Sequence, residues 1–533
     1  IYYYESKPAE GENPADAVID RADIATVTID KNVTLKADKL NLGQILDNSD
    51  LTDGLAERDA AAINLVVDGT VDAGTIYVSS YSTMTVNQSG KVVYTSQGGD
   101  SILRAGGKIV VNGYAYEDSV NALREVFPDL EIECSGYYIR FEDAEVLRVL
   151  LSKGVGDGVG ITYEQAEKVT HMRQWFENNT VIRKFNELRY FTNVTGYNTS
   201  NQPWYDFANC TALEEVDLRN FTAIQNAMFL GCTSLRKVGS LENVTIFNGS
   251  SFKNCESLEI ELNMPNLQTF GGSHSGFLNS GITKIISLGS ITTIASTQNN
   301  ATMGAFGYCK NLTEVNLPPT CTTLGNGVFA ECTALKKINA EHLTTIPNYT
   351  FQGCTALEEI DLSSATNIGN SSFSGCINLK NVKNIKNVTS MGTYCFFNCS
   401  SLENIALGGQ LTAIPNYAFE GCTLLSKFNL SGVETLGFRA FYNCPNLKNI
   451  GDVSSLTSMP QNVFYHSPIE IPEEFNAPLL SDLAGGCFNN CKIKRFIVSP
   501  LLTTYTNNQY NEEYAGGDFF GSDYVYVKAD PAP

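Results

Sequence analysis

A single motif, Phe-x-x-Cys-x-x-Leu, recurs through the second part of this 533-residue chain, most often every 22 to 23 residues. It first reads Phe207-Ala-Asn-Cys210-Thr-Ala-Leu213. Ten more copies keep the cysteine: Phe229/Cys232, Phe252/Cys255, Phe306/Cys309, Phe329/Cys332, Phe351/Cys354, Phe373/Cys376, Phe396/Cys399, Phe419/Cys422, Phe441/Cys444 and Phe488/Cys491. Three carry serine instead: Phe277/Ser280, Phe464/Ser467 and Phe519/Ser522. A unit this short cannot bury its apolar face alone, so the sequence predicts units stacked into a solenoid.

Residues 354–376 show what one unit is expected to form. The segment Leu357-x-x-Ile360-x-Leu362 ends in alternating apolar and polar residues, which predicts a short strand with one buried face. A polar turn then leads to Ile368 and Phe373 on the other side of the coil. Strands of successive units would pair in parallel, about 4.8 Å apart. The predicted fold is a repeat solenoid of about 14 units with parallel β-structure on one face.

The chain has 15 cysteines, and 11 of them occupy the same place in the repeat. A fixed repeat position is a packing position, where a free cysteine behaves as a small buried hydrophobe. The Cβ vectors of stacked cysteines would be parallel rather than convergent, which disfavours disulfides. We therefore expect free buried thiols. Four cysteines fall outside the repeat position: Cys134, Cys321, Cys395 and Cys487.

The full unit, Phe-x-x-Cys-x-x-Leu-x-x-Ile-x-Leu, resembles the BspA-like (Treponema-type) leucine-rich repeats of bacterial surface proteins. The resemblance covers roughly residues 205–530, and 11 of the 14 copies carry the cysteine. It implies a curved leucine-rich-repeat solenoid, export to the cell surface, and binding to host or matrix partners.

The polar positions of the predicted strands carry a pattern of charge. The second x of Leu-x-x-Ile alternates in sign through seven units: Glu215, Lys237, Glu259, Lys284, Glu314, Lys337 and Glu359. Opposite charges on adjacent strands predict a ladder of ion pairs, which would fix the register and leave little net field. Beyond it the same position holds Asn381, Asn404, Lys427 and Asn449. We expect this polar half to be the better binding candidate.

The spacing of the units is interrupted near the C-terminus. The insertion at 503–518 holds Tyr505, Tyr510 and Tyr514 among polar residues. Insertions in repeat proteins map to surface loops that often carry binding, so these tyrosines are candidate binding residues. The alternative is a tolerated loop at the end of the coil.

The first 200 residues do not follow the repeat. Residues 1–25 are acidic and predict a flexible tether. Residues 26–140 predict a β-rich module, either a sandwich or a β-solenoid, because short strand candidates recur. These lie at 26–29, 33–35, 63–67, 75–78, 84–86, 92–94, 109–111, 130–132 and 137–141. Helical patterns appear at 118–126 and 144–151.

Residues 141–204 are expected to form a small helical cap over the first repeat of a solenoid spanning 205–533. The box Thr162-Tyr-Glu-Gln165 and the spacing of Ala166, Met172 and Phe176 predict a helix over 162–178. The preceding Gly-rich stretch, 154–161, resembles an EF-hand-like or dockerin-like loop. Its early positions are glycines rather than carboxylates, so calcium binding is not expected.

Charge and termini limit the function further. The net charge is −21, and residues 1–180 hold 29 acidic against 15 basic residues, which disfavours nucleic acid and anionic membranes as partners. No apolar run approaches the roughly 18 residues of a membrane span. The chain begins Ile1-Tyr-Tyr-Tyr without Met, so we expect a processed product from which an export signal could have been removed.

No catalytic or metal-binding pattern is apparent. The four histidines, His171, His274, His342 and His466, lack metal or triad spacing. The pairs Cys395/Cys399 and Cys487/Cys491 lie far apart in the coil, which disfavours a zinc site. We expect no enzyme activity, no cofactor and no metal.

The sequence therefore predicts a non-enzymatic binding or adhesion protein, secreted or held at the outer cell surface. Its expected partner is an extracellular or host protein, and membrane contact would require a lipid anchor upstream of the chain, as in a lipoprotein. Two alternatives stay open: a carbohydrate-binding accessory protein, and a structural spacer without a ligand.

Overall fold

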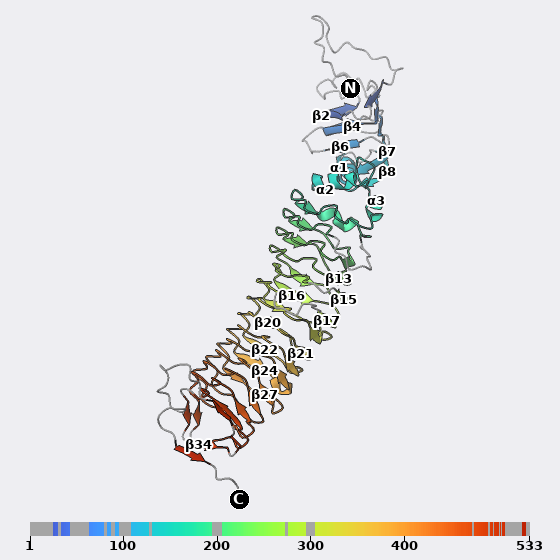
Figure 1. The fold of residues 1–533 in the computed structure, drawn as a ribbon. Coiled ribbons are helices and arrows are strands. Elements are labelled where there is room, and N and C mark those ends of the chain that lie inside the picture. Colours follow the sequence, from blue (N-terminus) through green and yellow to red (C-terminus); the bar gives the residue numbers. More distant parts are fainter. Residues whose placement is uncertain are drawn as a thin grey trace, which may run out of the picture. The chain divides into compact units, whose positions relative to one another are not determined.

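The computed structural model describes two compact units, Ile1–Val169 and Thr170–Pro533 (Figure 1). The described residues are 25–29, 34–42, 63–78, 83–86, 91–94, 108–126, 131–194, 205–271, 275–294, 304–471, 474–488, 491–493, 495–499, 501–502, 504–506 and 525–528. Within these ranges no helix has the length and apolar character that crossing a membrane requires.

The N-terminal unit is built on parallel strands in two sheets, ordered β1-β3-β5-β7-β8 and β2-β4-β6. The strands are β1 Ala25–Ile29, β2 Thr34–Leu42, β3 Ile63–Val67, β4 Thr70–Val78, β5 Thr83–Val86, β6 Lys91–Tyr94, β7 Lys108–Tyr116 and β8 Glu131–Tyr138. All pairings among them are parallel, and the chain alternates between the two sheets from β1 to β7. This is the arrangement of a β-solenoid, because a sandwich of the adhesin kind has antiparallel sheets.

Three short helices follow in this unit: α1 Glu117–Val126, α2 Ala144–Ser152 and α3 Tyr163–Glu167. The capping box at Thr162 and Gln165 is present, with each side chain accepting a hydrogen bond from the other residue's backbone N–H. The predicted helix over 162–178 is wrong beyond Glu167. Gln174 and Asn178 adopt left-handed backbone conformations, with φ of 58° and 60°, and these end any helix.

The C-terminal unit is a parallel β-solenoid in which most turns contribute strands to two rows, seen along the left and right sides of the coil in Figure 1. The first strand row contains β9 Lys184–Phe185, β10 Glu215–Val216, β12 Lys237–Val238, β14 Glu261–Asn263, β16 Lys284–Ser287, β18 Glu314–Val315, β20 Lys337–Ile338, β22 Glu359–Asp361, β24 Asn381–Lys383, β26 Asn404–Ile405, β30 Glu470–Ile471 and β33 Lys492–Ile493. Two short 3₁₀ helices, η3 Asn186–Tyr190 and η4 Ile385–Asn387, lie between strands.

The second strand row follows the polar turn of each unit. It contains β11 Ala223–Ile224, β13 Ile246–Asn248, β15 Thr269–Gly271, β17 Thr293–Ile294, β19 Thr323–Leu324, β21 Thr345–Ile346, β23 Asn367–Ile368, β25 Ser390–Met391, β27 Ala413–Ile414, β28 Thr435–Leu436, β29 Ser458–Met459, β32 Asp482–Ala484 and β35 Thr504–Thr506. A short third row forms at the C-terminal end from β31 Phe475–Asn476, β34 Arg495–Val498 and β36 Val525–Lys528. The leucine-rich-repeat solenoid predicted from the motif is confirmed.

The repeat phenylalanines form one buried stack through the middle of the coil. The rings belong to Phe176, Phe207, Phe229, Phe252, Phe277, Phe306, Phe329, Phe351, Phe373, Phe396, Phe419, Phe441, Phe464 and Phe488. Successive centroids lie 5.0 to 6.3 Å apart, with interplanar angles of 2° to 22°. Because each ring covers the next, the contacts between neighbouring turns hold the solenoid together.

Beside the rings runs a ladder of thiols. All 15 cysteines are free, and 14 of them are buried. In ten turns the repeat cysteine Sγ donates a hydrogen bond to the phenylalanine carbonyl oxygen of the preceding turn, as Cys354 does to Phe329 at 3.2 Å. Ser467 Oγ makes the same bond to Phe441, at 2.6 Å. The position therefore needs a small donor as well as a small volume, and serine supplies both.

One turn precedes the first one that carries the motif. Its sequence is Phe176-Glu-Asn-Asn179-Thr-Val-Ile182, with asparagine at the cysteine position. The Phe176 N–H donates to the carbonyl of Asp206 at 3.2 Å, as Phe207 N–H does to Met228 in the next turn. The turn continues into β9, which pairs in parallel with β10. A search for cysteine misses this turn, and its Phe176 was therefore placed in the predicted helix. The predicted boundaries at 25, 140 and 204, and the role of a cap, stay predictions.

Candidate binding surface

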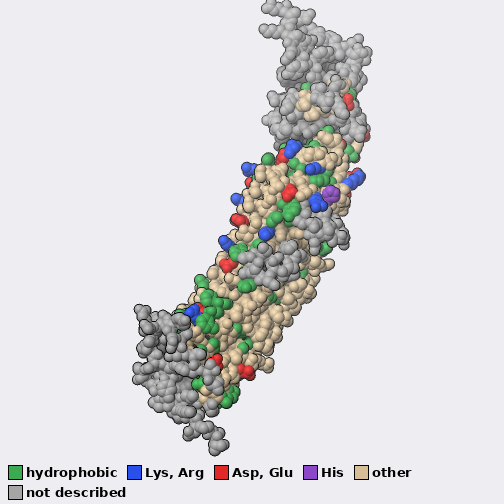
Figure 2. Space-filling view, in the orientation of Figure 1, with side chains coloured by type: hydrophobic (Ala, Val, Ile, Leu, Met, Phe, Trp, Pro, Cys, Tyr) green, Lys and Arg blue, Asp and Glu red, His purple; other side chains and the backbone are tan. Residues whose placement is uncertain are grey.

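The first strand row presents an outward-facing side chain at the same place in each turn. Strand pairing puts opposite charges side by side in several turns, and blue and red side chains alternate along the left margin of the coil (Figure 2). The aligned pairs are Lys184 with Glu215, Glu215 with Lys237, Lys284 with Glu314, and Glu314 with Lys337. The alternation of charge seen in the sequence therefore places acidic and basic residues next to each other on adjacent strands.

The residue beside Lys284 is Glu261, not the predicted Glu259. Their charged atoms lie 2.7 Å apart. Three residues rather than two separate Leu258 from the next fully buried residue, Leu262, so the strand begins one residue later in this turn. The pairing with the next strand is shifted accordingly, so Glu261 pairs with Lys284 and Glu259 lies before the strand.

Only part of the ladder closes into ion pairs. Besides Lys284–Glu261, Lys380 lies 3.2 Å from Glu358 and Lys383 lies 2.7 Å from Glu359. In the described part of the chain, the aligned charges of Glu215 with Lys237 and of Glu314 with Lys337 are not within ion-pair distance. Exposed pairs contribute about 0–1 kcal/mol each, so this row sets register and local charge balance more than stability.

Further along the row, Asn381, Asn404, Lys427 and Asn449 lie on four consecutive turns. Asn381 pairs with Glu359 on one side and with Asn404 on the other, and Lys427 bridges Asn404 and Asn449. All four side chains are exposed, while the next residue in each strand is buried. We call these four residues the polar row. Lys427 has no ion-pair partner within the described ranges, so the row offers amides and one uncompensated cation.

Of the three insertion tyrosines, Tyr505 lies among the described residues. Tyr505 lies in β35, paired with Leu483 of the second strand row. Tyr510 and Tyr514 lie outside the described residues.

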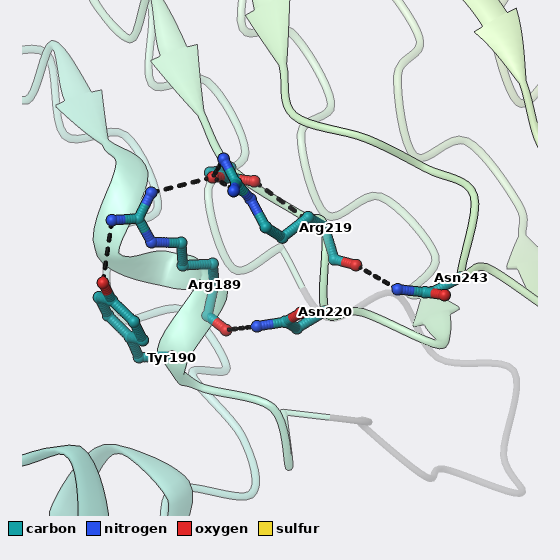
Figure 3. Close-up of polar contacts among 6 residues, drawn as sticks. Arg189, Tyr190, Arg219, Asn220 and Asn243 are labelled. Carbon is teal, nitrogen blue, oxygen red and sulfur yellow. Dashed lines mark hydrogen bonds and ion pairs between the residues drawn. The ribbon is translucent and has the colours of Figure 1, made fainter.

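At the start of the solenoid, Asp217 is a buried carboxylate held by two arginines (Figure 3). Its Oδ2 accepts from Arg219 Nε at 2.8 Å and from Arg189 at 3.2 Å, and Arg189 also donates to the Tyr190 hydroxyl. Burial raises the pKa of Asp217, but the hydrogen bonds and charges of the arginines outweigh it and lower that pKa overall. A carboxylate fixed in this way is a structural anion and not a free base.

Near Asp217 and its arginines, asparagine side chains form hydrogen bonds to the backbone of the preceding turn. Asn220 Nδ2 donates to the carbonyl of Arg189 at 3.0 Å, and Asn243 Nδ2 donates to the carbonyl of Arg219 at 2.7 Å (Figure 3). These bonds satisfy backbone acceptors that the short strands leave open.

The repeat thiols and the carboxylate of the Gly-rich loop are held in unreactive states. Burial raises the pKa of the repeat thiols, to about 11 for Cys309 and about 12 for Cys444, so they stay protonated and poorly nucleophilic at neutral pH. In the Gly-rich loop, Asp157 accepts hydrogen bonds from Val159 N–H, Gly160 N–H and the Tyr138 hydroxyl, which makes it a turn residue. Within the described ranges, no three His, Cys, Asp or Glu side chains come together as metal ligands would.

Against this geometry, the family model described as the BspA type leucine rich repeat region matches in six copies, over residues 190–302, 274–367 and 344–471. Together these ranges cover more than half of the chain. This chain belongs to the BspA-type leucine-rich-repeat family. The BspA-type match begins at residue 190, close to the additional turn around Phe176, and includes the whole polar row. No curated protein matches the chain.

Several solved structures are similar to this BspA-type chain. A leucine-rich repeat protein from Bacteroides ovatus is 22% identical, with 61% of this chain and 86% of that chain covered and a TM-score of 0.36. A leucine rich cell surface protein from Faecalibacterium prausnitzii is 21% identical, covers 52% and 74%, and has a TM-score of 0.31. The leucine rich repeat protein of T. pallidum is 21% identical, covers 37% and 68%, and has a TM-score of 0.21.

One surface feature was missed by sequence reasoning. Aromatic side chains that flank the buried phenylalanine in turns 394–466 gather on the outside of the coil. The signal is Tyr or Phe two or three residues before, or one residue after, the repeat phenylalanine.

Proposed function

We propose that this protein is a non-enzymatic binding protein, exported or held at the outer cell surface, that uses the first strand row to bind an extracellular or host protein. The observation that carries the proposal is the polar row: four exposed side chains, in register on consecutive turns, with no complete ion-pair ladder. Extended repeat surfaces suit protein ligands because many weak contacts add along the coil.

The two halves of the row differ in what they offer a partner. Between Glu215 and Glu359 the charges alternate, so a charged ligand meets little net field there. In the polar row, an amide can both donate and accept hydrogen bonds, and Lys427 adds one cation. A protein surface with its own amides and a carboxylate is the complementary partner.

The test is a binding screen of the purified chain against immobilised extracellular-matrix and host-surface proteins, with a glycan array in parallel. For a protein that binds, a variant with Asn404→Ala, Lys427→Ala and Asn449→Ala should lose about tenfold or more in affinity. The matched control, Lys237→Ala with Lys337→Ala in the alternating half of the same row, should change affinity by less than about threefold.

The alternatives give different results in the same experiment. Binding only on the glycan array, lost when residues 503–518 are deleted, would favour the carbohydrate-binding protein and contradict the proposal. Absence of binding on both surfaces would favour the spacer.

A further inference from the structure

A strip of aromatic side chains runs over four consecutive turns, at the edge of the coil that carries the phenylalanine motif. It contains Tyr394, Phe397, Tyr417, Phe438, Arg439, Tyr442, Tyr465 and His466, and we call it the aromatic strip. Tyr394 and Tyr417 stack at 4.3 Å and 6°, and Tyr442 and Tyr465 stack at 5.4 Å and 5°. Phe438 meets Tyr417 edge-on, at 5.4 Å and 81°.

The strip is a surface and not a core. Its seven members up to Tyr465 are half-buried and His466 is exposed, whereas the repeat phenylalanines beneath them are fully buried. These turns, 394 to 466, are also those that carry most of the polar row. Aromatic residues thus stay partly open to solvent over four consecutive turns.

The backbone beneath the strip is left-handed at one position of each turn. Tyr394, Tyr417 and Arg439 each lie two residues before the buried phenylalanine and have φ of 59°, 58° and 54°. Two other turns fill that place with Gly327 and Gly486, for which such angles cost little. The same conformation recurs at this position in Ala227, Tyr349, Ser371 and Asn462, so it belongs to the repeat, and only the side chains placed on it distinguish the strip.

Arg439 lies at the centre of the strip without a carboxylate partner. Its guanidinium carbon is 5.3 Å from the Phe438 ring centroid and 4.6 Å from that of Tyr442. Burial raises the pKa of Glu420, and the positive charge of nearby Arg439 only partly offsets this effect. Arg439 Nε and Glu420 Oε2 are both buried without a hydrogen-bond partner. One donor and one acceptor are thus held unpaired beside a row of rings.

We propose that the aromatic strip docks an extended, largely uncharged peptide segment of a partner protein. Because the unpaired atoms are buried, both side chains rotate outward on binding. Arg439 then donates to a backbone carbonyl of the segment, Glu420 accepts from a backbone N–H, and apolar side chains pack on the rings. A peptide backbone supplies the missing donor and acceptor together. Tyrosine and arginine are the residues that dominate protein-binding hot spots.

This inference rests on the proposed function, since it names a second contact surface for a protein partner. A glycan fits the strip less well, because sugars stack on open ring faces. Here Tyr394 covers Tyr417, Tyr442 covers Tyr465, and Arg439 covers Phe438.

The test is selection of a displayed library of random 12-residue peptides on the full chain, with the same chain applied to a glycan array. The selected peptides should be rich in apolar or proline residues and poor in charge. Their affinity should fall about tenfold or more for Tyr417→Asn and for Arg439→Asn. Asparagine tolerates left-handed backbone, so both variants are expected to fold, and circular dichroism checks this.

Tyr349→Asn is the matched control. Tyr349 occupies the same repeat position with φ of 62°, and in the described part of the chain its ring contacts no other ring. Selected peptides should bind this variant like the wild type. No enrichment of peptides, equal binding to all variants, or loss of glycan rather than peptide binding in Tyr417→Asn would overturn the inference. A natural partner protein that needs Asn404 and Asn449 but tolerates Tyr417→Asn would overturn it while leaving the proposed function intact.

Discussion

Replacing Phe373 with alanine should lower the free energy of unfolding by about 3–5 kcal/mol. Phe373 is fully buried in the middle of the ring stack, 5.3 Å from Phe351 and 5.1 Å from Phe396, so its removal opens a cavity and breaks contact between two turns. In a solenoid these contacts between neighbouring turns are the main source of cooperativity. Urea denaturation followed by circular dichroism gives the free energy of unfolding. A separate transition at low urea would show that the turns on one side of Phe373 unfold independently.

Ile377→Ala is the matched control, because Ile377 lies in the same turn and is 44% exposed. Its loss should change the free energy of unfolding by less than about 1 kcal/mol. Equal effects of the two substitutions would mean that the ring stack does not hold the turns together.

Asp206→Asn should stabilise the protein by about 4 kcal/mol at pH 8 and have little effect below pH 4. Asp206 is fully buried, and neither carboxylate oxygen has a hydrogen-bond partner. Burial raises its pKa to about 7, and the charge of Arg173 only partly opposes this. Between about pH 4 and 7 the folded state keeps a proton that the unfolded chain releases, so stability falls as pH rises through this window.

Asparagine cannot ionise, so the variant should lack this loss of stability, which thermal unfolding at pH 4, 6 and 8 would show. Asp217→Asn is the control, and its effect on stability should depend on pH in the opposite direction. The pKa of Asp217 is lowered by its arginines, so its stabilising effect is present at neutral pH and is lost as pH falls. An Asp206→Asn variant with the pH profile of the wild type would contradict the assignment.

The repeat could be predicted from the sequence because one motif position repeats one physical role. Phenylalanine and cysteine recur at fixed spacing, and period-2 alternation follows, so the buried ring stack and the first strand row could be inferred. The exposed state of Asn381 and Asn404 followed from the same alternation. For the N-terminal unit, the sequence left both a sandwich and a β-solenoid open, because the spacing of strands does not show whether they pair in parallel or antiparallel.

The errors arose where local spacing changed or the motif was degenerate. One additional residue before Leu262 moved the register from Glu259 to Glu261. Asn179 in place of cysteine hid the turn that begins at Phe176, and apolar residues at helical spacing then favoured a helix. The aromatic strip was missed because Tyr394 and Tyr417 come together only through stacking of turns 23 residues apart.

The measurement that tests the central claim most directly is a count of reactive thiols by mass spectrometry after iodoacetamide treatment without reductant. Rings and protonated thiols fill the inside of the coil, which leaves its surface for binding. Of the 15 cysteines, only the partly exposed Cys134 should be modified in the native protein, and all 15 should be modified in denaturant. Native labelling of several repeat cysteines, or disulfides that block labelling in denaturant, would contradict it.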